Sequence, residues 1–266
     1  MDDSTLFSIK DFAAFTGMRQ STLRYYDEIG LLTPICRGKN NYRYYEPYQI
    51  ILLNFINVLI DIGVPLAKVK DMMKGRNPQG ILELLNQKEA DLNYKFNEIR
   101  TAFSIIQTYR ENIQSGINQE EEDICVRDLP EANVVFGEKN DWSNQKSFYE
   151  PFIKFCNRAN RLRINLRYPI GGVHNDMISF LEAPGQPHRF YSLDPLGNSK
   201  RRAGKYLIGY KRGYYGEFGD FPLKMQAYAK ENNLIFKGPV YAHYLLDEIS
   251  IKENEQYLAQ IAVRVG

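Results

Sequence analysis

Arginine and tyrosine side chains gather in two short segments near the N-terminus, and both residue types can bind the sugar–phosphate backbone of DNA. The arginine guanidinium can donate two hydrogen bonds to a phosphate or a guanine, and the tyrosine hydroxyl can donate one to a phosphate oxygen. Five basic and three acidic residues lie between positions 19 and 46, although the whole chain carries a formal net charge of only +2. Because the positive charge is local, we predict a DNA-binding surface there. The eight candidates are Arg19, Thr22, Arg24, Tyr25, Arg37, Tyr42, Arg43 and Tyr44.

The chain lacks the residue patterns of metal or catalytic chemistry. Its three cysteines, Cys36, Cys125 and Cys156, are far apart, whereas a thiolate site needs at least two well-placed ligands. No Gly-x-Ser-x-Gly, HExxH or paired-carboxylate motif is present. We therefore expect no metal, no cofactor and no enzymatic activity.

Short helices separated by tight turns position the N-terminal candidates. Ser8 and Asp11 form a capping pair for a helix that ends near Phe15, and a second helix runs from about Gln20 to Ile29 and stops at Gly30. Two helices joined by a short glycine-containing turn are typical of a helix-turn-helix. Residues 32–45 predict a hairpin or wing, and further helices are expected at about 47–62 and 66–73.

A long helix with a heptad pattern follows, from Gln79 to about Ser115. Leucine or isoleucine recurs every seven residues from Leu85 to Ile113, with a companion stripe that includes Phe96 and Phe103. This pattern favours a coiled coil, and the alternative is an amphipathic helix packed on its own domain. Residues 116–123 are interpreted as a solvated linker.

After Ile124 the periodicity changes to short runs rich in β-branched and aromatic residues. The order strand, helix, strand, strand occurs twice, with strands expected at 132–137, 172–180, 189–193, 205–211, 240–246 and 256–265 and helices at about 147–161 and 221–232. This duplication predicts an α+β domain. We expect three regions in a multidomain α+β protein: a winged helix-turn-helix over 1–78, a coiled-coil helix and linker over 79–119, and an α+β domain over 120–266.

The first 75 residues resemble the MerR family of transcriptional activators. The resemblance rests on the ordered segments TLRYYDEIGLL (22–32), YRYY (42–45) and IGVPL (62–66). It implies a homodimer joined by an antiparallel coiled-coil dimerisation helix within 79–119, with two winged helix-turn-helix units on a pseudo-palindromic promoter and an effector-binding domain over 120–266. The bound dimer would bend and untwist a promoter spacer that is too long, so that RNA polymerase engages both promoter elements, which is indirect readout. Arg24, Tyr25, Arg43 and Tyr44 would then clamp the DNA backbone, with Arg19 and Thr22 nearer the base edges.

The C-terminal region resembles the GyrI-like, drug-binding domain of multidrug-sensing MerR regulators over about residues 124–266. The resemblance rests on the duplicated element order and on the segments FPLKMQAYAKENNL, PVYAHYLL and EQYLAQIAVRV. It implies a lipophilic aromatic effector, often cationic, bound between aromatic rings and a carboxylate. The candidates are Trp142, Phe148, Tyr149, Tyr168, Phe180, Tyr206, Tyr241, Glu255 and Tyr257.

One position departs from the multidrug-sensing pattern. Better-known members have a glutamate directly after the Val-Tyr of the penultimate strand, whereas Val240-Tyr241 is followed here by Ala242. Either Glu255 replaces that acid, or the effector depends less on charge. The remaining alternatives for the C-terminal domain are a small-molecule hydrolase and a drug-sequestering protein.

Composition places the protein in the cytoplasm with no membrane partner. The longest apolar stretch, 50–62, is interrupted by Asn54, Asn57 and Asp61, and the acidic N-terminus lacks the features of a signal peptide. We therefore predict a cytoplasmic, ligand-responsive transcription activator whose partners are double-stranded promoter DNA, a second copy of the chain, RNA polymerase holoenzyme and a small-molecule effector.

Overall fold

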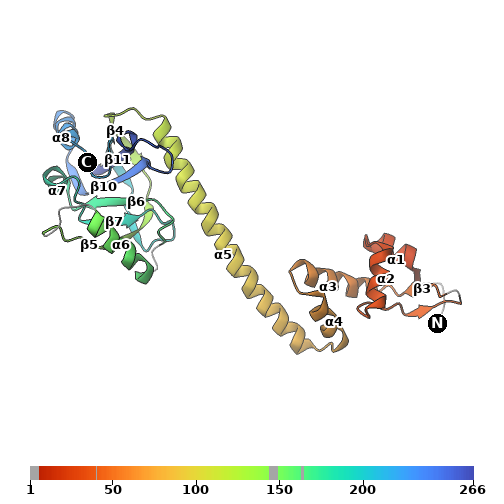
Figure 1. The fold of residues 1–266 in the computed structure, drawn as a ribbon. Helices are drawn as coiled ribbons and strands as arrows, with labels where there is room; N and C mark the ends of the chain where they lie inside the picture. The colour runs from red at the N-terminus through yellow and green to blue at the C-terminus, as the bar shows by residue number, and fades with distance from the viewer. Residues whose placement is uncertain (1–5, 40, 144–148, 163–164) are drawn as a thin grey trace. The chain divides into compact units, whose positions relative to one another are not determined.

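The computed structural model describes residues 6–39, 41–143, 149–162 and 165–266 (Figure 1). The chain divides into two compact units, Met1–Asn97 and Glu98–Gly266. None of the helices in these described ranges has the length and apolar character needed to cross a bilayer.

Four short helices and a small sheet build the first unit. The helices are α1 (Ile9–Thr16), α2 (Gln20–Glu28), α3 (Gln49–Asp61) and α4 (Leu66–Lys74), and the sheet has the order β1 (Phe7–Ser8), β3 (Arg43–Tyr45), β2 (Cys36–Arg37). Helix α1 begins as predicted, because the Ser8 Oγ accepts the Asp11 amide at 3.2 Å. Gly17 ends it at φ 68°, in the left-handed region that favours glycine. The helix-turn-helix and wing are confirmed.

The core of this unit fastens the wing to the helices. The Phe12 ring of α1 stacks on the Tyr45 ring of β3 with centroids 4.5 Å apart, and both side chains are fully buried. Leu23 of α2 and Leu53 and Ile56 of α3 join the same cluster. Burial of one face of each element leaves the opposite face of α2 in solvent.

Helix α5 (Pro78–Ile117) is a single 40-residue helix that runs from the first unit into the second. Near its start, Leu84 and Leu85 pack into the core of the first unit. Near its end, Ile113 packs beside Leu245 and Leu246 of the second unit. The middle of the helix carries an apolar stripe, which is described below.

The second unit is an eight-stranded sheet with the order β4-β9-β11-β10-β6-β7-β5-β8. Its elements are β4 (Ile124–Leu129), β5 (Ala132–Lys139), α6 (Tyr149–Leu162), β6 (Ile170–His174), α7 (Met177–Glu182), β7 (Arg189–Ser192), β8 (Ser199–Arg201), β9 (Gly204–Arg212), α8 (Phe221–Glu231), β10 (Phe236–Leu246), the 3-10 turn η2 (Asn254–Gln256) and β11 (Leu258–Val265).

The topology confirms the duplication. In each half a strand and a helix are followed by two strands, with the short helix α7 added between β6 and β7 in the first half. The last strand of each half inserts between the other two: β7 lies between β6 and β5, and β11 lies between β10 and β9. The halves join where β10 pairs with β6 in antiparallel fashion, with Ala242 opposite Gly172.

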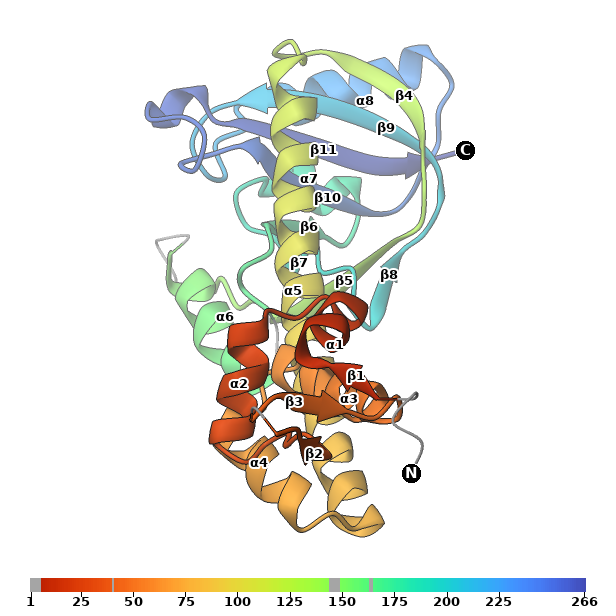
Figure 2. The same cartoon turned by 90° about the vertical axis from the view of Figure 1, so that its right-hand side faces the viewer.

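Alternate residues on the strands face two different layers. On one face, Leu207 and Ala242 pack in a cluster with residues of α7 and α8. On the other face, Tyr206 and Ile208 pack in a cluster that includes Ile113 of α5, which crosses in front of the sheet in Figure 2. Helix α6 packs on β5 and β7 through Phe155 and Phe190.

Several elements differ from the sequence prediction. The strand expected over 172–180 ends at His174, and α7 begins at Met177 after an Asp176–Ser179 capping box. The side chains at these two positions satisfy the free amides of the first turn, so they end the strand and start a helix. Strands β4 and β8 were not predicted at all.

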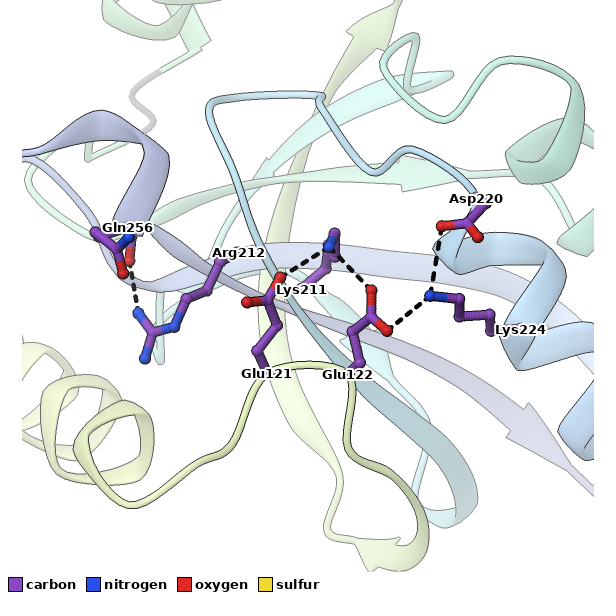
Figure 3. A network of polar contacts seen from close by, with 7 residues as sticks. All are labelled: Glu121, Glu122, Lys211, Arg212, Asp220, Lys224 and Gln256. Carbon is purple, nitrogen blue, oxygen red and sulfur yellow. Dashed lines mark hydrogen bonds and ion pairs between the residues drawn. The ribbon is translucent and has the colours of Figure 1, made fainter.

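The predicted solvated linker is instead held to the second unit by ion pairs (Figure 3). Lys211 of β9 contacts Glu121 at 2.8 Å and Glu122 at 3.0 Å, and Lys224 of α8 contacts Glu122 at 2.7 Å and Asp220 at 3.6 Å. The Glu122 amide also donates to the Tyr210 carbonyl at 2.7 Å. The end of α5 is therefore joined to the sheet by a fixed segment.

Candidate nucleic-acid interface and small-molecule cavity

Helix α2 presents the first group of candidate DNA-binding side chains. Arg19 occupies the N-cap, and Arg24 and Tyr25 are exposed on the helix, while Thr22 is half-buried. Leu23 is fully buried on the opposite face of the helix. This arrangement leaves two guanidinium groups and one phenol free to meet a DNA backbone.

The wing presents the second group, and its two arginines share one carboxylate oxygen. Asp27 Oδ2 accepts from Arg37 Nη2 and from Arg43 Nε, both at 2.6 Å. The Asp27 side chain is 4% exposed, and Arg37 also donates to Asn41 at 3.1 Å. The pairs leave one net positive charge and hold both guanidinium groups between α2 and the wing. Tyr42 is exposed and Tyr44 is half-buried.

The second unit contains a cavity of about 370 Å³ on the sheet face that packs against α7 and α8, at the junction of the two halves of the sheet. Gly172 and Ala242, which lie opposite each other on β6 and β10, form part of its wall. The segments before α8 and after β10 also line it, together with residues of α6, of the connections before β6 and after α7, and Tyr109 of α5. This volume is typical of sites that enclose a small organic molecule.

Tyrosines surround one end of the cavity. The Tyr215 ring lies 4.6 Å from the Tyr244 ring and 5.3 Å from the Tyr214 ring, measured between centroids. The Tyr244 hydroxyl donates to the Tyr214 carbonyl at 2.8 Å and accepts the Gly216 amide at 3.1 Å. The hydroxyls of Tyr149 and Tyr214 are hydrogen-bonded to each other. The rings are thus fixed in place and offer several π-faces.

Two carboxylates, Asp247 and Glu248, lie beside these rings on the turn that follows β10. The Tyr215 hydroxyl donates to Glu248 Oε2, and burial together with this carboxylate raises the pKa of Tyr215. Burial also raises the pKa of Asp247, with the Glu248 charge acting in the same direction. The pKa of Tyr109 is raised by burial and then by the charges of Asp247 and Glu248. The cavity therefore has a negative end.

The structure distributes the nine predicted effector-binding residues unevenly. Tyr149 and Tyr168 line the cavity, whereas Tyr206 and Tyr241 pack in clusters on the opposite face of the sheet. Glu255 is exposed on η2 outside the cavity lining. Phe148 lies outside the described residues.

The other three predicted residues sit behind the lining. Trp142 Nε1 donates to the Pro187 carbonyl at 3.0 Å, and the Phe180 ring lies 4.9 Å from His174. Tyr257 lies 5.7 Å from Tyr215. Both Pro187 and His174 line the cavity themselves.

Sequence reasoning did not find Tyr214, Tyr215 or the Asp247–Glu248 pair. These residues lie on connections between regular elements, where no periodic pattern marks the inner face. The sequence signal available for the two tyrosines was the segment Gly213-Tyr-Tyr-Gly216. Its two glycines, at φ 147° and 81°, form a turn that holds both tyrosine rings between them. In the described part of the chain, no three His, Cys, Asp or Glu side chains are placed to hold a metal ion.

Comparison with known proteins places the chain among DNA-binding regulators. Residues 7–76 match the family described as MerR HTH family regulatory protein. The chain is 24% identical over 270 residues to the multidrug-efflux transporter 2 regulator of Bacillus subtilis (strain 168), covering 99% of this chain and 98% of that protein. It is 34% identical over 95 residues to the HTH-type transcriptional regulator YyaN of the same strain, covering 35% of this chain and 67% of that one.

A solved structure also aligns along nearly the full chain. It is the cryo-EM structure of the EcmrR–DNA complex in EcmrR-RPo, with a TM-score of 0.39 and 15% identity, covering 97% of this chain and 99% of that one. The assignment to a family rests on the sequence matches.

Proposed function

Because the chain belongs to the MerR HTH family of regulatory proteins, we propose that it is a dimeric transcription activator whose C-terminal unit binds a small-molecule effector. The observation that carries the proposal is the combination of parts on one chain. A helix-turn-helix with exposed arginines and a separate aromatic cavity are joined by one continuous helix. This combination favours a regulator over the hydrolase or sequestering alternatives.

The candidate DNA-binding residues divide into two roles. Arg19 and Arg24 on α2 are exposed, so they are free to enter the major groove or contact phosphate. Arg37 and Arg43 are fixed by Asp27, so they present one oriented pair of guanidinium groups from the wing. We assign the wing arginines and the tyrosines 25, 42 and 44 to the DNA backbone.

The exposed stripe on α5 supports a homodimer. Leu92, Phe96, Ile99, Phe103 and Ile106 follow one another at alternating spacings of four and three residues, and their exposed fractions range from 45% to 68%. An apolar seam with this spacing is typical of a coiled coil. A second copy of α5, running antiparallel, covers it in our proposal.

The cavity supports an effector that is lipophilic and aromatic. Its walls include Phe152, Phe190 and Phe218 in addition to the tyrosines. The 98% coverage of the multidrug-efflux regulator from Bacillus subtilis agrees with a sensor of this kind. Effector binding would favour a dimer conformation that bends and untwists the promoter spacer for RNA polymerase, and the deformation energy would come from the DNA contacts.

A salt titration of DNA binding tests the role of α2. Replacing Arg24 with alanine leaves one phosphate per protomer without its cation, so the slope of log affinity against log salt becomes shallower by about 0.9 for each such phosphate. Fluorescence anisotropy with a labelled duplex from the chain's own upstream region measures this slope. Lys230→Ala, an exposed cation on α8, is the matched control and leaves the slope unchanged. An unaltered slope in Arg24→Ala would remove this residue from the DNA interface.

A further inference from the structure

We propose that Glu122 couples the aromatic wall of the cavity to the end of α5, so that an occupant which shifts the wall also shifts the helix. This inference rests on the proposed function of the cavity as an effector site. It identifies the residue through which that site regulates the rest of the chain. Glu122 does not itself line the cavity, so its role is that of a positioning residue.

Residues 213–220, which connect β9 to α8, form an aromatic loop on the cavity wall. Tyr214, Tyr215 and Phe218 of this loop line the cavity. An occupant of the cavity therefore meets the loop directly, and its affinity depends on the position of the loop.

The side chain of Glu122 closes the base of the aromatic loop (Figure 3). Its Oε1 contacts Lys211, near the end of β9, at 3.0 Å, and its Oε2 contacts Lys224, in the first turn of α8, at 2.7 Å. Glu121 contacts the first of these lysines, and Asp220 contacts the second. In the described part of the chain, Glu122 is the one acid that bridges the two lysines. One carboxylate thus holds both ends of the loop together.

The backbone of Glu122 supports a positioning role. Its φ is 63°, in the left-handed region. The other non-glycine residues of the described chain in this region are Asn41 and Asn233, and asparagine tolerates it better than most side chains. A glutamate there carries a conformational cost, which its ion pairs and the bond from its amide to the Tyr210 carbonyl offset. Backbone strain at a residue that joins separate elements points to a functional constraint.

The same bridge is attached to the end of α5. Gly116, in the last turn of the helix, packs so closely on β10 that a Cβ there would lie 2.6 Å from Leu246 Cγ. Between this turn and Glu122 the connection is short, and Gln119 Nε2 donates to Asp123 Oδ2 at 2.7 Å across it. The last turn of α5 and the base of the aromatic loop therefore belong to one packed assembly.

The bridge matters for position more than for stability. The side chains of Glu122 and Lys224 are 36% and 42% exposed, so their pair contributes little to the stability of the fold. Without the bridge, the loop and the end of α5 can shift independently, and an occupant that favours one loop position no longer favours one helix position. The proposal therefore predicts a loss of communication without a comparable loss of stability.

DNA binding measured with and without an aromatic probe tests the bridge. The methyltriphenylphosphonium ion is suitable, because its rings are not coplanar and do not intercalate between base pairs. Calorimetry measures its binding to the full-length protein, and anisotropy with a labelled duplex from the chain's own upstream region measures DNA affinity without the probe and at saturation. In the wild-type protein we expect the probe to change the DNA dissociation constant by at least about fivefold.

The variant Glu122→Gln keeps the size of the side chain and removes its charge. We expect the probe to change its DNA dissociation constant by less than about twofold, while the probe itself binds within about threefold of its wild-type affinity. Lys224→Met removes the α8 side of the bridge and gives the same result. Glu121→Gln, the same change in charge at the neighbouring position, leaves the bridge in place and keeps the wild-type effect of the probe.

A second substitution, Glu122→Gly, separates this role from folding. Glycine adopts a positive φ readily, so the urea midpoint of this variant is no lower than that of Glu122→Gln. The effect of the probe on DNA affinity is nevertheless lost in both variants. If Glu122 served stability alone, the effect of the probe would instead follow the urea midpoint.

The outcomes distinguish the two levels of inference. If the wild-type protein does not bind the probe, or binds it with no effect on DNA affinity, the proposed effector function fails and this inference fails with it. If the probe acts equally on the wild-type protein and on Glu122→Gln, the bridge alone is overturned. An equal loss in Glu121→Gln would also overturn it, because total charge and not the bridge would then carry the effect.

Discussion

At the scale of single residues, Asp27 decides how the wing presents its charge. It is acidic and buried on the same helix that offers Arg24 to solvent, and its single oxygen holds both Arg37 and Arg43. Counting charges alone, an aspartate in this position weakens DNA binding. The geometry indicates the opposite, because two long flexible side chains are held where the wing meets α2.

Replacing Asp27 with asparagine separates these views. A neutral amide cannot hold two guanidinium groups as a carboxylate does, so stability falls by about 1–3 kcal/mol and DNA affinity falls by about tenfold, despite the gain of one positive charge. Urea unfolding and anisotropy with labelled promoter DNA measure the two effects. Glu28→Gln, the same change in charge at the exposed neighbouring position, is the control. Tighter DNA binding by Asp27→Asn would show that charge outweighs position.

Single residues also show which parts of the two candidate sites could be predicted from the sequence. The arginines and tyrosines of α2 and the wing are marked by composition and spacing, and the structure brings them into one small unit. The sequence did not indicate on which face of the sheet the side chain of Tyr241 lies. Adjacent side chains on β10 point to opposite faces, so Ala242 and Tyr244 reach the cavity and Tyr241 does not. Which face holds the cavity depends on packing between strands far apart in sequence.

At the scale of elements, long periodic segments were the most predictable. Helix α5 extends by a few residues at most beyond its predicted range, because five heptads leave little room for another structure. The strand expected over 172–180 was wrong after His174. There the capping side chains of Asp176 and Ser179 outweigh the apolar pattern. Whether the three predicted regions act as separate domains stays a prediction.

The apolar stripe on α5 gives a prediction at this scale. Ile99 is 68% exposed near the middle of the helix. An aspartate there would have to be buried in the proposed dimer seam. We therefore expect the dissociation constant of the dimer to rise by at least about a hundredfold, while the helix itself remains folded. Light scattering coupled to size-exclusion chromatography measures the mass. Asn97→Asp, a charge of the same kind at another exposed position of α5, leaves the dimer intact. Equal dissociation of both variants would argue against a seam at Ile99.

At the scale of the whole molecule, two histidines are buried without charge in the second unit. Burial lowers the pKa of His174 to about 4, and burial with the nearby Arg201 lowers the pKa of His243 to about 4. His243 Nδ1 lies 3.4 Å from the Tyr191 hydroxyl. In the unfolded chain both histidines regain an ordinary pKa near 6.5 and take up protons that the folded state does not.

Stability therefore falls as the pH drops from about 6.5 towards 4. The unfolded state binds more protons in this window, which costs about 2 kcal/mol for each histidine by pH 5. Chemical denaturation of the full-length protein at pH 7 and pH 5 measures the difference. The double variant His174→Gln, His243→Gln flattens the dependence. An identical pH dependence in that variant would assign the acid sensitivity to other groups.

Tyr109 belongs both to the cavity wall and to the helix that continues into the first unit. An occupant that contacts Tyr109 would thus touch the same helix that continues into the helix-turn-helix unit. If the two sites are coupled, the factor by which the effector changes the affinity for promoter DNA equals the factor by which promoter DNA changes the affinity for the effector. Promoter-bound and free protein would hold the effector unequally, and the ratio of the two dissociation constants is itself the strength of the signal.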